Sequence, residues 1–469
     1  MSGSLRAVIV GAGPAGLRAA EQLVEAGLRP VLVDEAERVG GQIYRQPPPA
    51  LRRDGRALYG FEAGKAAALF ARFEALKAQL DHRPGTLVWH LEDRQLHLLR
   101  GAATEVLPFD ALILATGATE RVLPFPGWTL PGVLTLGAAQ IALKAQASLV
   151  GPRVVFAGTG PLLYLVAWQY LKAGGQVQAV LDSAPPGAAL RALPGLLARP
   201  AMAARGAWML ARLRAAGVAL RQGATLLRAE GAGRVESLLW QDSVGVHHTP
   251  CDAVAFSHGL RSETQLADLA GCAFEFDPLD QAWRPKRDAA GRSSVAGVYL
   301  AGDGAAVLGA DAAELAGARA ALALLQDHGQ PSSADQAGRL QRRLQAQQRF
   351  RAGLERMAAP PAQWAAEAPD DLIVCRCEEV TAGELRACVR DTGARELNRL
   401  KAQTRIGMGR CQGRMCGAAA ARLLADAAGC SLAEVGRLRG QPPVKPVPIA
   451  ALADLQAASR PVPQDQADD

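Results

Sequence analysis

Several features are missing from this sequence, and each absence excludes a class of protein. No apolar run among the 469 residues reaches the length of about 18 that a membrane-spanning helix needs. Aromatic residues make up only 5%, and the net charge of +7 is scattered, without the basic runs that bind nucleic acid. The first ten residues lack the cationic and apolar segments of a secretory leader. We therefore expect a globular, cytoplasmic chain with no transmembrane segment and no nucleic-acid partner.

The cysteines lack the C-x-x-C spacing of redox-active disulfide pairs. Cys251 and Cys272 lie far apart in the sequence and are expected to be buried thiols of the core. The histidines likewise lack the H-E-x-x-H spacing of zinc hydrolases. Because cytoplasmic thiols stay reduced, a cluster among the eight cysteines indicates metal binding rather than disulfide bonds.

Apolar runs, glycine turns and helical patterns alternate along most of the chain. The order is strand, helix, strand at the start and again from Val154. This order predicts an α/β protein with two dinucleotide-binding (Rossmann-like) folds, the second inserted in the first, and a small helical domain after them. The expected divisions are residues 1–122 with 290–330, residues 123–289, a helical linker at 331–369, the small domain at 370–440 and a proline-rich, extended or disordered tail at 441–469.

The first glycine loop has the context of a nucleotide site. The motif G-A-G-P-A-G follows a predicted strand and opens a predicted helix, whose free N–H groups attract a pyrophosphate. Two acidic residues end the next strand, where a carboxylate can accept hydrogen bonds from a ribose. The alternative is a plain glycine turn. The residues assigned to nucleotide binding are Gly11, Gly13, Pro14, Ala15, Gly16, Asp34 and Glu35.

Three further segments indicate which nucleotide the first fold binds. The strand patterns F-D-A-L-I-L-A-T-G at 109–117 and G-V-Y-L-A-G-D at 297–303, with the glycine pair at 40–41, resemble flavoproteins that have two dinucleotide-binding domains. The resemblance implies FAD in the first fold, with Asp303 at the ribityl chain and Gly302 at the pyrophosphate; a helix N-cap is the alternative for Asp303. The residues implied are Gly41, Gln42, Ala115, Thr116, Gly117, Gly302 and Asp303.

The second glycine loop, at 158–163, is imperfect. It reads G-T-G-P-L-L, so Leu163 stands where a third glycine belongs and is expected to push the helix away from the strand. Asp182 ends the next strand, where it could hold a ribose, and no neighbouring basic residue would bind the 2′-phosphate of NADP. Three interpretations stay open for this fold: NAD, another adenine nucleotide, or no ligand.

Four cysteines form two pairs near the carboxyl end. Cys375 and Cys377 are separated by one residue, and Cys411 and Cys416 by four. Converging thiolates repel one another unless a metal neutralises them, and soft sulfur selects zinc or iron–sulfur. Zinc sites favour C-x-x-C pairs, whereas unequal spacings and a glycine-dense loop at 407–417 favour a 2Fe-2S cluster. Zinc and free core thiols are the alternatives.

Two motifs extend the resemblance over the whole chain. C-R-C-E-E-V-T at 375–381 and G-R-C-Q-G-R-M-C-G at 409–417 resemble the bacterioferritin-associated-ferredoxin type of 2Fe-2S domain. With G-G-Q-I-Y-R at 40–45 and P-F-P-G-W-T-L-P-G-V at 124–133, the chain resembles the large (α) subunit of multi-subunit flavin amino-acid dehydrogenases. That family includes D-hydroxyproline dehydrogenases, opine oxidases and dye-linked proline dehydrogenases, with hydrogen cyanide synthase close by.

The resemblance implies an electron-transfer subunit. Amine oxidation would take place on a D-amino-acid-oxidase-like β subunit with its own FAD, beside an FMN at the subunit interface and a small ferredoxin-like subunit. Electrons would leave to a quinone or respiratory acceptor, with the complex in the cytoplasm or peripheral at the inner membrane. No catalytic residue is predicted on this chain. The alternatives are a stand-alone NADH-dependent FAD/2Fe-2S reductase and a non-catalytic iron–sulfur binding module.

Overall fold

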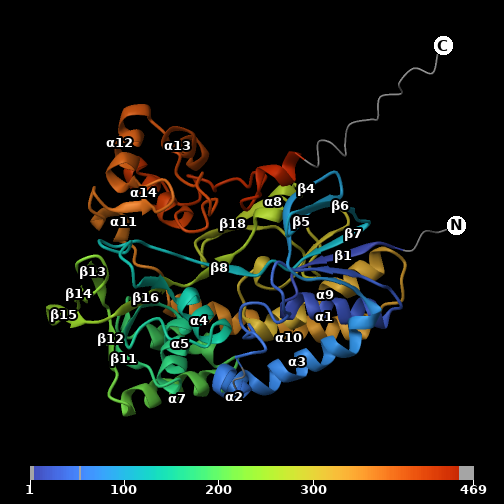
Figure 1. The fold of residues 1–469 in the computed structure, drawn as a ribbon, viewed down its shortest axis with the longest axis horizontal. Coiled ribbons are helices and arrows are strands. Elements are labelled where there is room, and N and C mark those ends of the chain that lie inside the picture. The colour runs from blue at the N-terminus through green and yellow to red at the C-terminus, as the bar shows by residue number, and fades with distance from the viewer. Residues whose placement is uncertain (1–4, 52–53, 454–469) are drawn as a thin grey trace.

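The computed structural model describes residues 5–51 and 54–453. Two five-stranded parallel sheets form its core (Figure 1). Along the chain, strands of the first sheet come both before and after the strands of the second sheet. This order confirms the predicted fold class, with one nucleotide-type fold inserted in another. In the order β20-β7-β1-β2-β3, the strands of the first sheet are Val298–Leu300, Ala111–Leu114, Ala7–Val10, Val31–Val33 and Asp81–Arg83.

The first sheet is covered on both faces, as its sequence requires. Every residue of β1, β2, β7 and β20 is buried, and such continuous apolar runs suit parallel strands that have no solvent face. Helices α1 (Pro14–Glu25) and α9 (Ala310–Asp327) pack against each other so closely that a Cβ on Gly317 would lie 1.9 Å from the Ala15 carbonyl oxygen. This contact places the start of α1 beside the segment that follows β20.

The second sheet has the order β12-β11-β10-β16-β9, and its strands are Ala219–Gln222, Gln176–Asp182, Arg153–Thr159, Ala253–His258 and Val133–Thr135. Its helices are α4 (Leu136–Ala145), α5 (Pro161–Lys172), α6 (Ala188–Leu196) and α7 (Pro200–Ala215). Leu163 of α5 is fully buried among apolar side chains of this fold. Cys251 and Cys272 are buried free thiols, as predicted.

Smaller antiparallel sheets and short helices connect these parts. The three-stranded sheet β4-β5-β6 lies beside the first parallel sheet (Figure 1). Its strands are Thr86–Glu92, Gln95–Arg100 and Ala103–Pro108. The other antiparallel strands are β8 (Ala118–Glu120), β13 (Thr225–Glu230), β14 (Ser237–Gln241), β15 (Val246–Pro250), β17 (Leu260–Ser262), β18 (Phe274–Asp277) and β19 (Ala282–Pro285). The remaining helices of these two folds are α2 (Gly55–Tyr59), η1 (Gly60–Glu62), α3 (Ala63–Leu76), η2 (Lys77–Gln79), α8 (Gln265–Leu269) and η3 (Gly302–Gly304).

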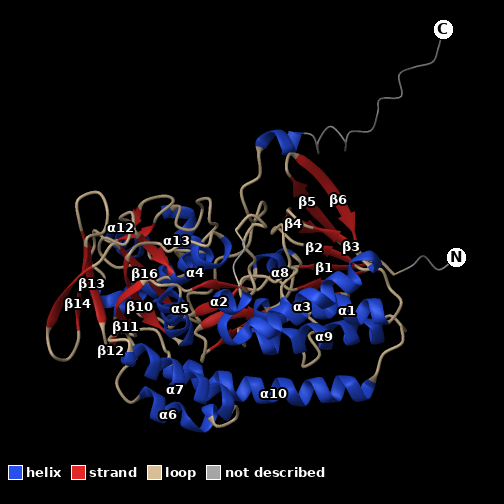
Figure 2. Ribbon diagram, turned by 60° about the horizontal axis from the view of Figure 1, so that its bottom comes forward, coloured by secondary structure: helices blue, strands red, loops and turns tan. Residues whose placement is uncertain are grey.

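The segment at 331–369 packs against the rest of the protein. Its long helix α10 (Ala334–Met357) runs along one side of the molecule (Figure 2) and buries Leu340 and Leu344 in the core of the first fold. The same helix approaches α6, where a Cβ on Gly195 would lie 2.6 Å from the Cα of Gly353. The helix therefore ties the two nucleotide-type folds together and is more than a spacer.

The carboxyl-terminal domain is small and mostly helical. It contains β21 (Ile373–Cys375), β22 (Val380–Thr381), α12 (Ala382–Thr392), α13 (Leu397–Thr404) and α14 (Gly417–Ala428), preceded by α11 (Trp364–Glu367). A capping box between Thr381 and Glu384 fixes the start of α12. The apolar side chains of this domain share one core with the second sheet, so the domain is docked on that fold.

Residues 441–453 of the expected extended or disordered tail pack against the protein, so this part is not disordered, although residues 441–448 contain no helix or strand. Val444 is buried, its N–H donates to the Trp89 carbonyl oxygen at 3.0 Å, and its carbonyl oxygen accepts from Arg414 at 2.7 Å. The proline-rich composition gives the segment few apolar groups of its own, but a folded sheet supplies the apolar surface it needs. The remainder of the expected tail, at 454–469, lies outside the described residues.

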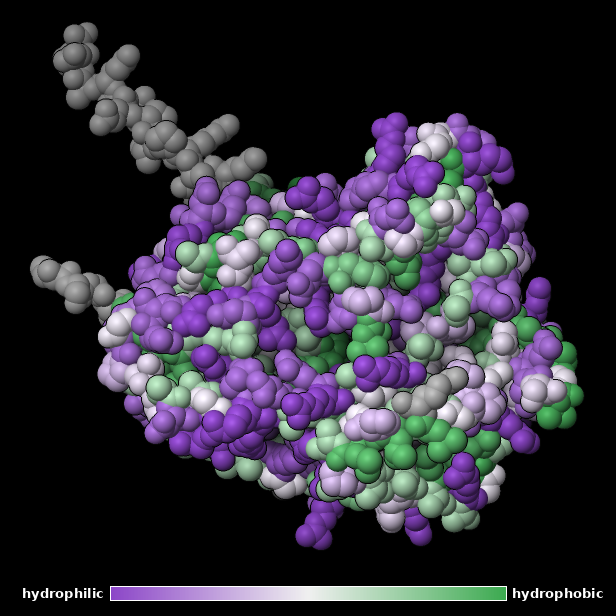
Figure 3. Space-filling view, turned by 180° about the vertical axis from the view of Figure 1, so that it is seen from behind, coloured by the Kyte–Doolittle hydropathy of each residue, from purple (hydrophilic) through white to green (hydrophobic). Residues whose placement is uncertain are grey.

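Polar side chains cover most of the surface seen from behind, and apolar ones gather toward the side of the second sheet (Figure 3). Among the exposed apolar residues on that fold are three leucines of α6 and the turn after it, Leu190, Leu193 and Leu197. In the described part of the chain, no helix combines the length and the apolar character needed to cross a membrane.

Candidate functional site

The first glycine loop joins β1 to α1 at positions where only glycine fits. Gly11 has φ +106°, and a Cβ there would lie 2.4 Å from the Ala115 carbonyl oxygen. A Cβ on Gly16 would lie 1.8 Å from the Gly11 carbonyl oxygen. Since both contacts are with backbone atoms, no side-chain rearrangement could relieve them. The glycines therefore bring strand, helix and β7 close together around one loop.

The amino-terminal end of α1 is suited to an anion. Gly13 is its N-cap, no side chain of the described residues caps it, and its first turn holds no acidic residue. Buried Pro14 and Ala15 begin the helix, so backbone N–H groups beyond Pro14 supply the positive end of the helix dipole. A Cβ on Gly302 would lie 2.7 Å from the Ala15 Cβ, so η3 closes on the same end. These features fit the pyrophosphate of a dinucleotide.

The structure separates the two acidic candidates at the end of β2. Asp34 turns toward the glycine loop, where its carboxylate accepts the N–H groups of Ala12 at 2.5 Å and Ala36 at 2.7 Å. Burial raises the pKa of Asp34, and these hydrogen bonds oppose the shift. Glu35 is exposed and pairs with Lys445 of the carboxyl-terminal segment. The geometry therefore favours Asp34 over Glu35 as the ribose-binding carboxylate.

The other residues assigned to FAD lie around the same loop, at varying distance from it. A Cβ on Gly41 would lie 3.0 Å from the Gly13 Cα, which places Gly41 beside the loop, whereas Gln42 is exposed and accepts from Arg45. Ala115, the residue after β7, is buried under Gly11, and Thr116 and Gly117 continue the same edge. A Cβ on Gly304 would lie 2.6 Å from the Thr116 Oγ1, so η3 also borders this edge.

Asp303 holds the loop between η3 and α9. Its Oδ1 accepts the N–H groups of Leu308 at 2.9 Å and Gly309 at 3.0 Å. Burial raises the pKa of Asp303, and the two hydrogen bonds act in the opposite direction. Gly309 is the N-cap of α9, and no side chain of the described residues caps that helix. Asp303 is thus not an N-cap, and its second carboxylate oxygen has no protein donor among the hydrogen bonds of the described residues.

The four cysteines come together from two segments. Cys375 ends β21 and Cys377 follows it, while Cys411 and Cys416 flank the glycine-rich turn before α14. The Cys416 thiol hydrogen-bonds with those of Cys375 and Cys411, and the Cys411 thiol also contacts Cys377. A Cβ on Gly409 would lie 2.2 Å from the Cys377 Cβ, so this position must also be glycine.

The arrangement of the four sulfur atoms distinguishes the candidate metals. A tetrahedral zinc site with Zn–S bonds of about 2.3 Å would hold all four about 3.8 Å apart. Within the described residues, no three of them lie within 4.8 Å of one another, although neighbouring ones are in contact. Such an open chain does not surround a single tetrahedral ion, which disfavours the zinc alternative.

Two of these thiols ionise easily, as metal ligands must. The hydrogen bond from Cys416 lowers the pKa of Cys375 to about 6 and also lowers the pKa of Cys411. Donating those bonds raises the pKa of Cys416, and burial raises that of Cys377. The donor set is therefore partly anionic at neutral pH.

One residue joins the two candidate sites. The Thr116 Oγ1 donates to the Glu263 carbonyl oxygen at 2.7 Å, and the Glu263 N–H donates to the Gly117 carbonyl oxygen at 3.0 Å. The Glu263 carboxylate pairs with Arg414 at 2.7 Å, and Arg414 lies between Cys411 and Cys416. The nucleotide edge and the cysteine loop are therefore attached to opposite ends of the same residue.

Neighbours of Glu263 hold the cysteine loop through its carbonyl groups. Arg261 donates to the carbonyl oxygens of Gly413 at 3.2 Å and Arg414 at 2.8 Å. Gln265 donates to the Gln412 carbonyl oxygen at 2.7 Å. This docking segment, 261–268, is not predicted from the sequence, because no local motif marks it. Only the fold brings it beside residues some 150 positions later.

Asp268→Ala should loosen this docking. Asp268 is bidentate to Arg437 at 2.5 and 2.7 Å, also accepts the Gly440 N–H at 2.5 Å, and leaves only 7% of its side chain exposed. Removing it leaves a partly buried guanidinium unpaired, which costs about 3 kcal/mol. Limited proteolysis and urea unfolding should show earlier release of the carboxyl-terminal domain. Arg390→Ala, which breaks only the exposed pair with Asp391, should change stability by no more than about 0.5 kcal/mol.

The second glycine loop differs from the first. Position 158 requires glycine, since a Cβ there would lie 1.7 Å from the Ser257 carbonyl oxygen. However, the Asp182 carboxylate is buried and accepts the Tyr164 hydroxyl at 2.6 Å and the Ala184 N–H at 2.9 Å. Leu163 fills the place of the third glycine with a buried side chain. Asp34 in the first fold also accepts two protein N–H groups, but it is only half-buried, whereas Asp182 is buried and the Tyr164 side chain lies on it. The Asp182 carboxylate is therefore less accessible to a ribose than that of Asp34.

Comparison with protein families matches two parts of the chain. Residues 5–339 match the family described as pyridine nucleotide-disulphide oxidoreductase, and residues 373–426 match the BFD-like [2Fe-2S] binding domain. The second match spans all four clustered cysteines.

Relatives similar to the whole chain include components of multi-subunit enzymes. An opine oxidase subunit of Rhizobium meliloti is 37% identical over 97% of this chain and 88% of the relative. Hydrogen cyanide synthase subunit HcnB of Pseudomonas protegens is 35% identical over 96% of this chain and 97% of the relative. Among solved structures, L-proline dehydrogenase from P. horikoshii has a TM-score of 0.71 at 20% identity, covering 96% of this chain and 79% of that one.

Proposed function

Because this chain belongs to the pyridine nucleotide-disulphide oxidoreductase family and is an FAD-dependent oxidoreductase with a 2Fe-2S domain, we propose that it is the electron-transfer subunit of an amino-acid dehydrogenase complex. Its similarity to an opine oxidase subunit supports this proposal. The proposed substrates are secondary amino acids of the opine, proline or D-hydroxyproline type. They would be oxidised on a partner β subunit with its own FAD, beside an FMN at the interface.

The proposed reaction balances across the complex. On the partner, the amine gives up two electrons and two protons and becomes an imine. A quinone would take up two electrons and two protons and become a quinol, whereas an acceptor of electrons alone would leave the protons in solvent. Bound FAD exchanges electrons in pairs or singly, and a 2Fe-2S cluster exchanges them singly. The residues of this chain bind and position both groups, and none is proposed to act as a general acid or base.

Particular residues can be assigned to each group. For FAD, the loop of Gly11, Gly13 and Gly16 would face the pyrophosphate, with Asp34 at the ribose and Asp303 at the ribityl chain. For the cluster, the ligands would be the two cysteine pairs. We propose the full sets as Gly11, Gly13, Pro14, Ala15, Gly16, Asp34, Gly41, Gln42, Ala115, Thr116, Gly117, Gly302 and Asp303 for FAD, and Cys375, Cys377, Cys411 and Cys416 for iron.

The observation that carries the proposal is the attachment through Glu263. Its backbone bonds to Thr116 and Gly117 and its side chain to Arg414 between the cysteines. A domain that merely stored iron would need no such connection to the nucleotide fold. Two sites for redox groups held in one rigid unit are what an electron-transfer subunit requires.

A partner subunit would also need a surface on this chain. Leu190, Leu193 and Leu197 are 76%, 48% and 64% exposed and lie three and four residues apart, on one side of a helix. Exposed apolar stripes of this kind are typical of protein interfaces. The opposite side of α6 is occupied by α10.

Co-purification of the natural complex tests the proposal. We expect a second flavoprotein to be recovered with this chain, and the complex to oxidise a secondary amino acid with transfer of electrons to a quinone. Recovery of a fully active lone chain would contradict the proposal.

NADH should reduce the purified chain poorly. Anaerobic addition of NADH is expected to leave the flavin absorbance at about 450 nm nearly unchanged over the time in which dithionite bleaches it. The reason is that the Tyr164 hydroxyl already donates a hydrogen bond to the buried Asp182 carboxylate, and that Leu163 stands in place of the third glycine of the loop. Rapid bleaching by NADH would instead favour the stand-alone reductase.

A further inference from the structure

The hairpin of β4 and β5 carries three potential metal ligands on one face. His90 pairs with His97 across the two strands, and Glu92 lies two residues beyond His90 on β4. Side chains two apart on a strand point to the same side, as do directly paired ones. A tight turn at Asp93 and Arg94, which have φ 45° and 60°, fixes this register.

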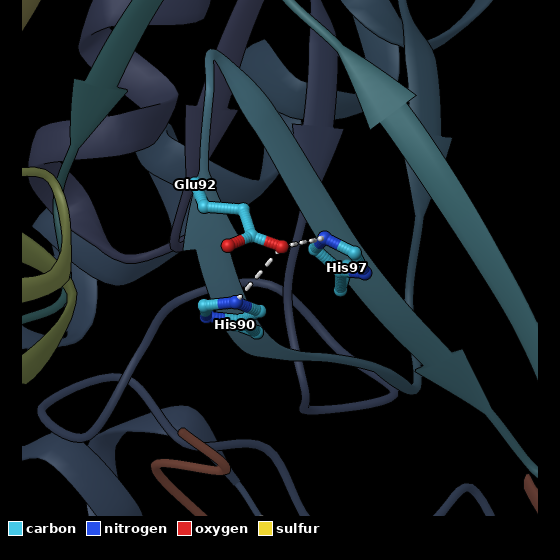
Figure 4. A group of neighbouring side chains, drawn as sticks. All are labelled: His90, Glu92 and His97. Atoms are coloured by element: carbon cyan, nitrogen blue, oxygen red, sulfur yellow. Dashed lines mark ion pairs between the residues drawn. The ribbon is translucent and has the colours of Figure 1, made fainter. Parts of the chain in front are cut away.

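The donor atoms of these residues converge. The Nε2 atoms of His90 and His97 lie 3.3 Å and 3.7 Å from the same Glu92 oxygen, Oε1. One atom from each residue lies within 4.8 Å of the other two, and both rings turn toward the carboxylate (Figure 4). Two ligands of a tetrahedral ion, with bonds of about 2.0–2.2 Å, lie roughly 3.3–3.6 Å apart. The hairpin thus already spaces these atoms nearly as an ion would.

Within the described part of the chain, hydrogen bonding leaves several nitrogen atoms of this cluster without a partner. The Nε2 and Nδ1 atoms of His97 and the Nδ1 of His90 are buried and have no hydrogen-bond partner among the described residues. The 3.7 Å from His97 to Glu92 is too long for a hydrogen bond. A neutral imidazole offers a lone pair, which a metal ion can use.

We propose that His90, Glu92 and His97 form a binding site for a divalent transition cation of the zinc type. Two imidazoles and a carboxylate are ligands of zinc and related ions, and a fourth position remains for water. Glu92 is 58% exposed, which gives the ion a path from solvent, while the histidines are 15% and 16% exposed and anchor the site. The site is chemically distinct from the thiolate cluster, since it holds only nitrogen and oxygen donors.

The position of the site suggests what bound metal would do. Trp89, which packs beside His97 with ring centroids 5.2 Å apart, bonds through its carbonyl oxygen to the Val444 N–H. A bound cation would therefore stabilise the β4–β5 hairpin, against which the chain packs at Val444 after it leaves the cysteine domain. This role is structural and makes no use of the proposed redox groups.

Zinc titration of the full chain tests the proposal. The protein, loaded with FAD and iron and treated with EDTA, would be titrated with Zn²⁺ by calorimetry alongside His97→Ala and Glu92→Gln. Because Glu92 is exposed, Glu92→Gln should leave the fold intact. His247→Ala is the matched control: His247 also lies on a hairpin, 2.9 Å from a carboxylate oxygen of Asp242 and stacked on Trp240. Its neighbour His248 lies near Glu230 instead, so no second histidine shares the Asp242 carboxylate.

We expect one Zn²⁺ equivalent in the wild type and in His247→Ala, with binding weakened roughly tenfold or more in the other two variants. Equal binding by all four proteins, or no binding by the wild type, would overturn the proposal. As a second readout, Cu²⁺ added to the oxidised wild type should show EPR hyperfine coupling to two imidazole nitrogens, and to one in His97→Ala. Absence of nitrogen coupling in the wild type would contradict the site.

Discussion

Cys411→Ser should abolish the iron–sulfur absorbance and the EPR signal of the dithionite-reduced protein, with iron content falling to roughly a tenth of wild type or less. Cys411 links the two pairs, because its thiol contacts both Cys416 and Cys377. A serine hydroxyl is a much poorer ligand for iron than a thiolate. FAD content should stay at the wild-type level, since the glycine loop lies in another fold.

Cys388→Ser is the matched control for this prediction. Cys388 lies in α12 of the same domain, where its thiol interacts with Gln403 at 3.0 Å, outside the four-cysteine cluster. This variant should keep its iron. Retention of iron by Cys411→Ser would show that the proposed ligand set is wrong. A wild type that contains zinc and flavin but no iron–sulfur absorbance would revive the zinc alternative.

Gly16→Ala should remove most of the bound FAD. The new Cβ would lie 1.8 Å from the Gly11 carbonyl oxygen and 3.3 Å from the Ile9 Cγ2, so α1 must move away from the loop. Overpacking of this kind costs roughly 1–3 kcal/mol or more. Because the amino-terminal end of α1 would shift with the helix, we expect flavin content to fall at least tenfold, to roughly a tenth of wild type.

Gly206→Ala is the control for a glycine-to-alanine substitution that causes no steric clash. Gly206 lies in α7, where an added Cβ meets nothing within 4 Å, so alanine there should raise stability by about 0.5–1 kcal/mol. Flavin absorbance of the two purified variants, normalised to protein, measures the difference. A normal flavin content in Gly16→Ala would contradict the assignment of this loop to FAD.

Local signals in the sequence explain what could be predicted. Glycine spacing, apolar runs and the cysteine motifs each act over a few residues, and they indicate the fold class and the family resemblance that comparison confirms. The convergence of Cys375 with Cys416 was also foreseeable, because free thiolates at such spacings need a metal.

Long-range pairing explains what could not be predicted. Glu263 meets Arg414 across 151 positions, and Asp268 meets Arg437 across 169, with no motif at either end. The choice of Asp34 over Glu35 depends on Lys445, which the tail brings from 410 positions away. The cluster of His90 and His97 depends on a turn without glycine, so its register is not evident from the sequence.

The return of the chain to Trp89 has a consequence for how the cysteine domain can move. The domain enters through α11, whose Trp364 donates to the Pro124 carbonyl oxygen at 2.8 Å, and leaves through Val444 on the β4-β5-β6 sheet. A module anchored at both ends has no hinge about which to swing and cannot diffuse away. The proposed electron exchange between the flavin and the cluster should therefore be insensitive to dilution and to solvent viscosity, unlike exchange with a freely diffusing ferredoxin.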